Sequence, residues 1–117
     1  MITAPPLPLL PGHLLVEADA ASVAAVVAEW LEQALRRGAL LGLATGRTME
    51  PVYAALRSRI LALAPAEREP LLARWRSFNL DEYVGLAADH PASFAAFMRQ
   101  QVGDPLSLAA QCLQLPD

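Results

Sequence analysis

The sequence predicts an α/β fold built on a doubly wound, mostly parallel sheet. Short apolar or β-prone runs alternate with helical patterns of about ten to eighteen residues. Polar residues directly follow two of those runs, and no internal repeat competes with this pattern. The 117 residues are 55% hydrophobic and 18% charged. That composition suits one compact core and leaves no room for a second domain.

The chain divides into a proline-rich N-terminal arm, residues 1–12, and one domain, residues 13–117. The arm has no hydrophobic periodicity, so we expect an extended segment held to the surface through Leu7, Leu9 and Leu10.

The domain begins with a strand-to-helix step. Residues 14–16 form a β-prone run, and Asp19 is placed to cap the following helix. Arg36 and Arg37 suit a helix C-terminus, and Gly38 ends the helix. The predicted buried stripe comprises Val23, Val26, Val27, Trp30, Leu31, Ala34 and Leu35.

A second strand-to-helix step follows. Residues 39–43 are almost all apolar, which predicts a strand covered on both faces. We expect Thr48 to cap the next helix, with Glu50 and Pro51 in its first turn. Its predicted inner face comprises Val52, Tyr53, Leu56 and Ile60.

The third step is preceded by two prolines. Residues 64–70 are predicted as a loop, residues 71–74 as a helical turn and residues 75–80 as a strand. His90 precedes a third helix, with Pro91 at its first position. The aromatic and sulfur-bearing side chains expected in the core are Trp30, Phe94, Phe97 and Met98.

Composition excludes several classes of function. The net charge is −3, which disfavours nucleic-acid binding. All nine cationic residues are Arg, so no lysine is present for a Schiff base or a P-loop. Cys112 is expected to be an inert thiol, and two histidines, His13 and His90, are too few for a metal site. We expect no cofactor, no membrane span and a cytoplasmic location.

The segment Thr45, Gly46, Arg47 and Thr48 stands between a predicted strand and a helix N-terminus. Free N–H groups and the helix dipole attract a phosphate at such a position. It matches neither a Walker A loop nor G-x-G-x-x-G, so a nucleotide is not indicated. An ordinary turn and a phosphate site both remain open.

A second polar cluster comprises Asn79, Asp81, Glu82 and Tyr83, at the carboxyl end of a predicted strand. A half-buried carboxylate here can act as a general base. The alternative is a solvated turn. If the two strands are neighbours, both polar segments line one crevice.

Two motifs then point to a family. Residues 41–56, LGLATGRTMEPVYAAL, resemble the phosphate loop of glucosamine-6-phosphate deaminases and the related 6-phosphogluconolactonases. Residues 78–86, FNLDEYVGL, followed by HPASF at residues 90–94, resemble the deaminase branch. The similarity spans residues 14–115 and the N-terminal half of such an enzyme.

The resemblance implies a modified Rossmann-like fold, here truncated after its first strands and helices. It implies conversion of glucosamine 6-phosphate to fructose 6-phosphate and ammonia, in amino-sugar metabolism. Asp81 matches the proton acceptor, and Thr45, Gly46 and Thr48 match the phosphate loop. Arg47 replaces a small residue, and its guanidinium can either crowd the loop or add a phosphate contact.

The family's later segment, whose Asp, His and Glu open the sugar ring, has no match in these 117 residues. We therefore expect no turnover from this sequence alone. The alternatives are a 6-phosphogluconolactonase and a non-catalytic fragment that binds a sugar phosphate or a partner. Expected partners are a sugar phosphate and either a second copy of the chain or a complementing C-terminal half.

Overall fold

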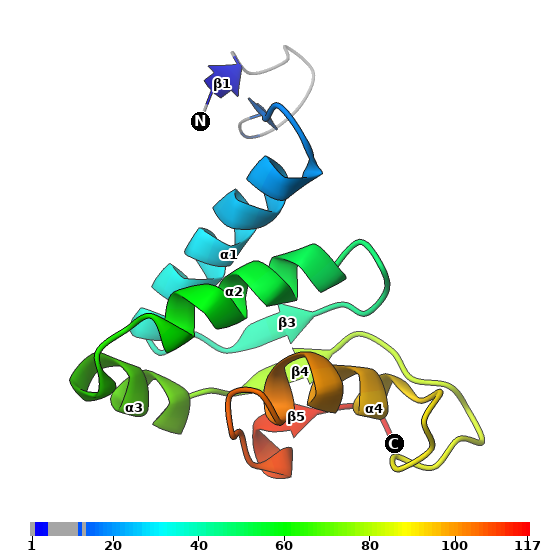
Figure 1. Ribbon diagram of the computed structural model, residues 1–117. Coiled ribbons are helices and arrows are strands. Elements are labelled where there is room, and N and C mark those ends of the chain that lie inside the picture. Colours follow the sequence, from blue (N-terminus) through cyan, green and yellow to red (C-terminus); the bar gives the residue numbers. More distant parts are fainter. Residues whose placement is uncertain (1, 5–11, 13) are drawn as a thin grey trace.

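The computed structural model describes residues 2–4, 12 and 14–117 (Figure 1). The strands are β1 (Ile2–Ala4), β2 (Leu14–Val16), β3 (Leu41–Leu43), β4 (Ser77–Asn79) and β5 (Leu113–Gln114). The α-helices are α1 (Ala20–Arg36), α2 (Glu50–Leu61), α3 (Pro65–Ala73) and α4 (Phe94–Met98). A π-helix, η1 (Arg99–Gly103), continues α4, and a short 3₁₀ helix, η2 (Ala110–Cys112), precedes β5.

The centre of the molecule is a parallel sheet in the order β3-β4-β5. Leu41 pairs with Ser77, and Ser77 pairs with Leu113 in turn. Helical segments connect the strands, as a parallel sheet requires. The prediction of an α/β fold with a mostly parallel sheet is confirmed. Strand β5 lies within residues 106–115, where the sequence pattern is ambiguous between helix, strand and loop.

The N-terminal strands form a separate sheet. Strand β2 has the predicted bounds, but it pairs antiparallel with β1 and not with the central sheet. Part of the expected extended arm is thus the strand Ile2–Ala4. The predicted anchors Leu7, Leu9 and Leu10 lie outside the described residues.

One face of the central sheet carries the core. Leu41 and Leu43 are buried on that face, as are Ser77 and Asn79 on β4. Helices α2 and α4 cross in front of the strands (Figure 1). The apolar side chains that pack there include Tyr53, Leu56, Ile60, Trp75, Met98 and Val102.

The other face of the sheet is open in the described part of the chain. Gly42 is exposed, and Phe78, its partner on β4, is 49% exposed. The expectation that residues 39–43 are covered on both faces is therefore wrong. Alternating side chains point to opposite faces of a strand, and helices cover only one face here.

Helix α1 begins and ends as predicted. The Asp19 carboxylate accepts a 2.8 Å hydrogen bond from the Ser22 N–H, and Gly38 has a left-handed φ of 72° after the helix. The buried stripe is nevertheless rotated from the predicted one, because Trp30 is 49% exposed. Small residues, Ala24 and Ala28, face inward and allow α1 to pack closely against α2.

Glu32 on α1 is buried without having been predicted. Its carboxylate accepts from Arg36 at 3.0 Å and from Arg59 of α2 at 3.1 Å. The ion pair with Arg59 ties the two helices together. A buried carboxylate needs such partners, since burying an unpaired charge is costly.

Two helix boundaries differ from the predictions. In the predicted loop of residues 64–70, residues 65–70 belong to helix α3. Pro65 sits in its first turn, where the missing N–H costs nothing, and Pro70 is tolerated inside it. Helix α4 begins at Phe94 instead of Pro91, since the Ser93 hydroxyl caps it by accepting from the Ala96 N–H at 3.0 Å.

Candidate functional site

The parallel register brings together the two polar segments that the sequence singled out. Leu43 pairs with Asn79, and the Leu80 N–H donates to the Leu43 carbonyl at 3.1 Å. Thr45 and Asp81 each lie two residues beyond this last pair. The expectation that the two strands are neighbours is confirmed, and both polar segments leave the same edge of the sheet.

The segment after β3 forms a compact turn before α2. Gly46 adopts a φ of 111°, a left-handed conformation that favours glycine. The Met49 N–H donates to the Gly46 carbonyl at 3.0 Å, and the Glu50 N–H to the Arg47 carbonyl at 3.2 Å. Helix α2 then starts at Glu50, with Pro51 in its first turn as predicted.

The predicted cap of α2 is wrong. The N-cap residue is Met49, and no side chain of the described residues caps this helix end. Thr48 lies in the turn before it and is exposed, as is Arg47, whereas Thr45 is half-buried. The polar side chains of the turn are thus not used to hold the N-terminus of α2.

Tyr53 fixes the start of this turn. Its hydroxyl donates to the Ala44 carbonyl, and its ring packs edge-on against Phe97 at 6.2 Å between centroids. Burial raises the pKa of the Tyr53 hydroxyl to about 12. Sequence periodicity placed Tyr53 on the inner face of the helix, but it did not predict the hydrogen bond from its hydroxyl to the Ala44 carbonyl.

At the end of β4, the side-chain amide of Asn79 is buried and unpaired in the described structure. Its side chain is 7% exposed, and neither Oδ1 nor Nδ2 has a hydrogen-bond partner in the described structure. Buried amides are almost always paired, so this one represents a cost to folding. It faces the same side of the sheet as Leu43.

Asp81 and Glu82 have opposite surroundings. Asp81 is exposed. Glu82 is the half-buried one, and its carboxylate accepts from the N–H groups of Phe94 at 2.8 Å and Ala95 at 2.9 Å. It also accepts from its neighbour, the Tyr83 N–H, at 2.9 Å.

These hydrogen bonds change the acidity of Glu82. Desolvation by burial alone raises the pKa of its carboxyl, but the three N–H donors of Phe94, Tyr83 and Ala95 outweigh it. The pKa is therefore lowered from its ordinary value. Glu82 anchors α4, and it is not a free base.

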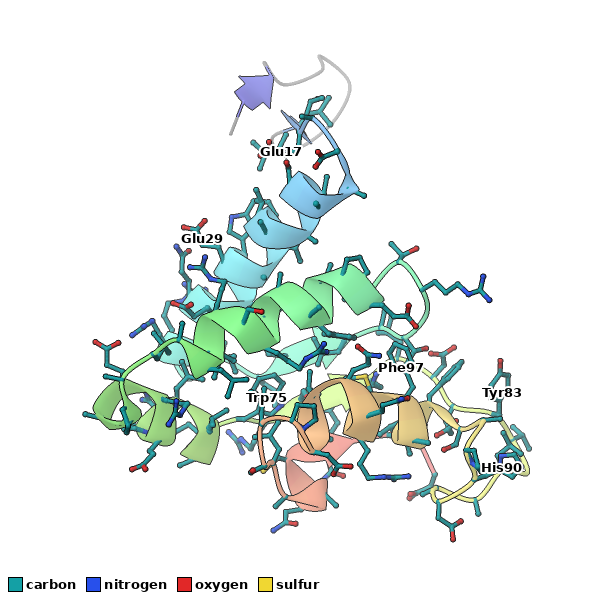
Figure 2. All side chains as sticks on the ribbon, viewed as in Figure 1. Glu17, Glu29, Trp75, Tyr83, His90 and Phe97 are labelled. Atoms are coloured by element: carbon teal, nitrogen blue, oxygen red, sulfur yellow. The ribbon has the colours of Figure 1, made fainter. Side chains whose placement is uncertain are left out.

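Contacts between its own residues hold together the loop between Glu82 and α4. The rings of Tyr83 and Phe94 pack at a tilt of 43°, with centroids 4.6 Å apart, and the His90 Nδ1 accepts from the Ala92 N–H at 3.0 Å. Figure 2 shows Tyr83 and His90 on this loop, far from Trp75 in the core. The two separated motifs, residues 78–86 and 90–94, are thus one structural unit.

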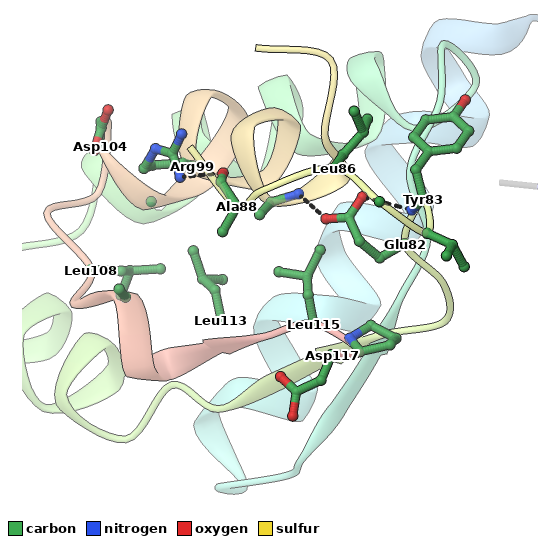
Figure 3. Close-up of a pocket in the computed structure, with 16 residues that line it drawn as sticks. Glu82, Tyr83, Leu86, Ala88, Arg99, Asp104, Leu108, Leu113, Leu115 and Asp117 are labelled. Carbon is green, nitrogen blue, oxygen red and sulfur yellow. Dashed lines mark hydrogen bonds between the residues drawn. The ribbon is translucent and has the colours of Figure 1, made fainter. Parts of the chain in front are cut away.

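A cavity of about 660 Å³ lies beside this unit, between the 82–88 loop, the α4 and η1 helices and the end of β5 (Figure 3). Glu82 and Tyr83 line it, together with Arg99 and several leucines. Neither Asp81 nor the segment 45–48 does. The cavity is distinct from the edge of the sheet where β3 and β4 end.

Within residues 2–4, 12 and 14–117, no group of His, Cys, Asp and Glu side chains is arranged to hold a metal ion. No helix in the same part of the chain has the length and apolar character that a membrane span requires.

Several known proteins that are similar to this chain are glucosamine-6-phosphate deaminases. The chain is 38% identical over 107 residues to the glucosamine-6-phosphate deaminase of Streptomyces coelicolor, covering 90% of this chain and 39% of that protein. It is 37% identical over 100 residues to that of Rhodopirellula baltica, covering 84% and 38%. No family model matches the chain.

Among solved structures, the chain resembles a monomeric glucosamine-6-phosphate deaminase of the NagB superfamily. The TM-score is 0.75 at 25% sequence identity, over 86% of this chain and 41% of that one. The chain therefore spans about two-fifths of the length of the relatives that it matches. Over the part that aligns, in both sequence and fold, this chain is homologous to the glucosamine-6-phosphate deaminases.

Proposed function

We propose that the edge of the sheet where β3 and β4 end is the sugar-phosphate and proton-acceptor part of a glucosamine-6-phosphate deaminase. The complete reaction converts glucosamine 6-phosphate to fructose 6-phosphate and ammonia. The observation that carries the proposal is the register of β3 and β4, by which Thr45 and Asp81 leave the sheet side by side. Ligands of doubly wound sheets bind at this edge.

The turn of residues 45–48 is suited to a phosphate. It stands at the N-terminus of a helix of 12 residues whose end no side chain of the described structure caps. Backbone N–H groups and the helix dipole favour an anion there. The Thr45 and Thr48 hydroxyls and the exposed Arg47 guanidinium add donors.

Asp81 is the group that we assign to proton transfer. Its carboxylate is exposed at the end of β4, so a sugar held by its phosphate at residues 45–48 can reach it. A carboxylate in this position takes the C2 proton of the opened sugar and is itself protonated. Glu82 keeps the adjoining backbone in place through α4.

A titration followed by amide NMR shifts tests the phosphate site. We expect glucosamine 6-phosphate to shift the amide signals of residues 45–50, whereas glucosamine does not. Thr48→Ala should weaken binding several-fold, because it removes a donor to the phosphate. Ser58→Ala, an exposed hydroxyl later in the same helix, is the matched control and should bind as the unaltered chain does.

Equal shifts with both sugars would exclude a phosphate site at this turn. We expect no ammonia release from these 117 residues alone, because the ring-opening Asp, His and Glu implied by the resemblance have no match in them.

A further inference from the structure

Tyr53 joins the two ends of the turn between β3 and α2. Its side chain is completely buried, and its hydroxyl donates to the carbonyl of Ala44, nine residues earlier and directly before the segment 45–48. Its own N–H donates to the Met49 carbonyl at 2.9 Å, at the start of α2. Residues 44–53 therefore form a loop that one side chain closes, and the N–H groups of residues 45–48 belong to it.

The Tyr53 ring is held from outside this loop. It packs against the Phe97 ring of α4, with centroids 6.2 Å apart and an angle of 63° between the ring planes. The N-terminus of α4 is fixed in turn, because the Glu82 carboxylate accepts from the N–H groups of Phe94 and Ala95. A buried side chain that is packed in this way keeps one conformation, so its hydroxyl stays in place as a donor.

We propose that Tyr53 is a positioning residue of the sugar-phosphate site, whose hydroxyl holds the turn of residues 45–48 in the conformation that binds the phosphate. This inference rests on the proposed function. Because Tyr53 is buried, it acts through the Ala44 carbonyl and not by contact with the sugar. A turn that is ordered before binding loses less conformational freedom when the phosphate binds, and the affinity is higher for that reason.

The turn needs such a restraint because it contains Gly46. This glycine has a φ of 111°, and glycine loses more conformational freedom on ordering than any other residue. A tyrosine hydroxyl can supply the restraint without adding a charge that would compete for the phosphate. Burial raises the pKa of the Tyr53 hydroxyl to about 12, so it remains protonated and able to donate near neutral pH.

Hydrogen exchange tests the positioning without any ligand. Met49 and Glu50 report on the turn, because their N–H groups donate to carbonyls inside it. Tyr53→Phe keeps the ring and removes only the hydroxyl. It should speed exchange of these two amides about fivefold, the effect of one hydrogen bond of ordinary strength, and change that of the α1 amides by less than about twofold.

Ser77→Ala is the matched control. Ser77 is buried on β4, and its hydroxyl accepts a 3.1 Å hydrogen bond from the Trp75 indole N–H, so this variant also loses one buried hydrogen bond. It should lower the resistance to urea, as Tyr53→Phe does, without a specific effect on the turn amides. In titrations with glucosamine 6-phosphate, Tyr53→Phe should raise Kd about fivefold, whereas Ser77→Ala should change it by less than about twofold.

An unchanged exchange rate at Met49 and Glu50 in Tyr53→Phe would overturn the proposal. So would a Kd that the two variants raise equally, since a general loss of stability would then explain the weaker binding. If the unaltered chain binds glucosamine 6-phosphate no better than glucosamine, the proposed function fails, and the role of Tyr53 in that site fails with it. Faster exchange in Tyr53→Phe would in that case still show that the hydroxyl holds the turn.

Discussion

The N-termini of α4 and α2 differ in whether side chains cap them. The N-terminus of α4 is closed by side chains, since Glu82 accepts from the N–H groups of Phe94 and Ala95 and Ser93 accepts from that of Ala96. The N-terminus of α2 has no side-chain cap within the described structure, and it follows a turn whose polar side chains are largely exposed.

The two helix ends have different roles: the N-terminus of α4 stabilises the fold, and we assign the N-terminus of α2 to ligand binding. Both helix ends present backbone N–H groups. At α4 those of Phe94, Ala95 and Ala96 donate to side chains, which fixes the loop that follows β4. At α2 the Glu50 N–H donates to the Arg47 carbonyl, Pro51 has no N–H, and no side chain of the described residues accepts there. The adjoining carboxylates divide in the same way, since Glu82 is engaged and Asp81 is exposed.

The largest expected effect is on turnover. In a chimera in which this chain replaces the aligned segment of the Streptomyces coelicolor deaminase, Asp81→Asn should lower kcat by about 10²-fold or more, because the amide cannot accept the C2 proton. Ammonia release measures it, and the melting temperature should not change. The control is Asp89→Asn, another exposed carboxylate. Full turnover by the Asp81→Asn variant would show that Asp81 is not the proton acceptor.

Glu82→Ala should act on stability instead. It removes the acceptor of three backbone N–H groups, and we expect a loss of about 2 kcal/mol in the free energy of unfolding. Urea unfolding measures the loss. Glu50→Ala, in the first turn of α2, should cost only about 0.5 kcal/mol, since it caps nothing. Equal losses for the two variants would contradict the contrast between these helix ends.

Asn79→Leu should have the opposite effect on stability from Glu82→Ala. Replacing a buried, unpaired amide by an apolar side chain of similar size should stabilise the fold by about 1 kcal/mol. Binding of glucosamine 6-phosphate should weaken at the same time. Ser77→Ala is the control on the same strand face and should destabilise, because it leaves the Trp75 indole N–H without its acceptor. A destabilised Asn79→Leu variant would mean that the amide serves the fold.

The smallest effect is a dependence on pH. The folded-state pKa of Glu82 is lowered, so its contribution to stability is complete above the unfolded value of about 4.3. The contribution is lost as the pH falls through the lower folded-state pKa. The stability difference between the unaltered chain and Glu82→Gln should therefore shrink, by less than about 1 kcal/mol, between about pH 7 and about pH 3. A difference independent of pH would argue against an ionised anchor.

Much of the local structure could be predicted from the sequence. The cap at Asp19, the helix end at Gly38 and the turn between β3 and α2 all follow from short-range rules. The two polar segments at the ends of β3 and β4 were also predicted from the local sequence. Each of these features depends on residues within a few positions of one another.

Other features depended on tertiary contacts. The partners of Glu82 lie 12 and 13 residues away in sequence, and Tyr53 reaches back nine residues to the Ala44 carbonyl. Periodicity correctly made α1 amphipathic but did not fix which side faces α2, so Trp30 was wrongly assigned to the core. The pattern of residues 39–43 likewise could not show that helices cover only one face of β3.

The sequence by itself determined where β2, α1, β3, α2 and β4 form and which polar residues follow β3 and β4. Capping, turn chemistry and hydrophobic period act over a single turn or a few residues of chain, so they are present in the local sequence. The tertiary structure alone decided that Glu82 anchors α4, that Asn79 is buried without a partner and that one face of the sheet is bare. Burial and hydrogen-bond pairing depend on which distant segments the chain brings together, and no local pattern contains that information.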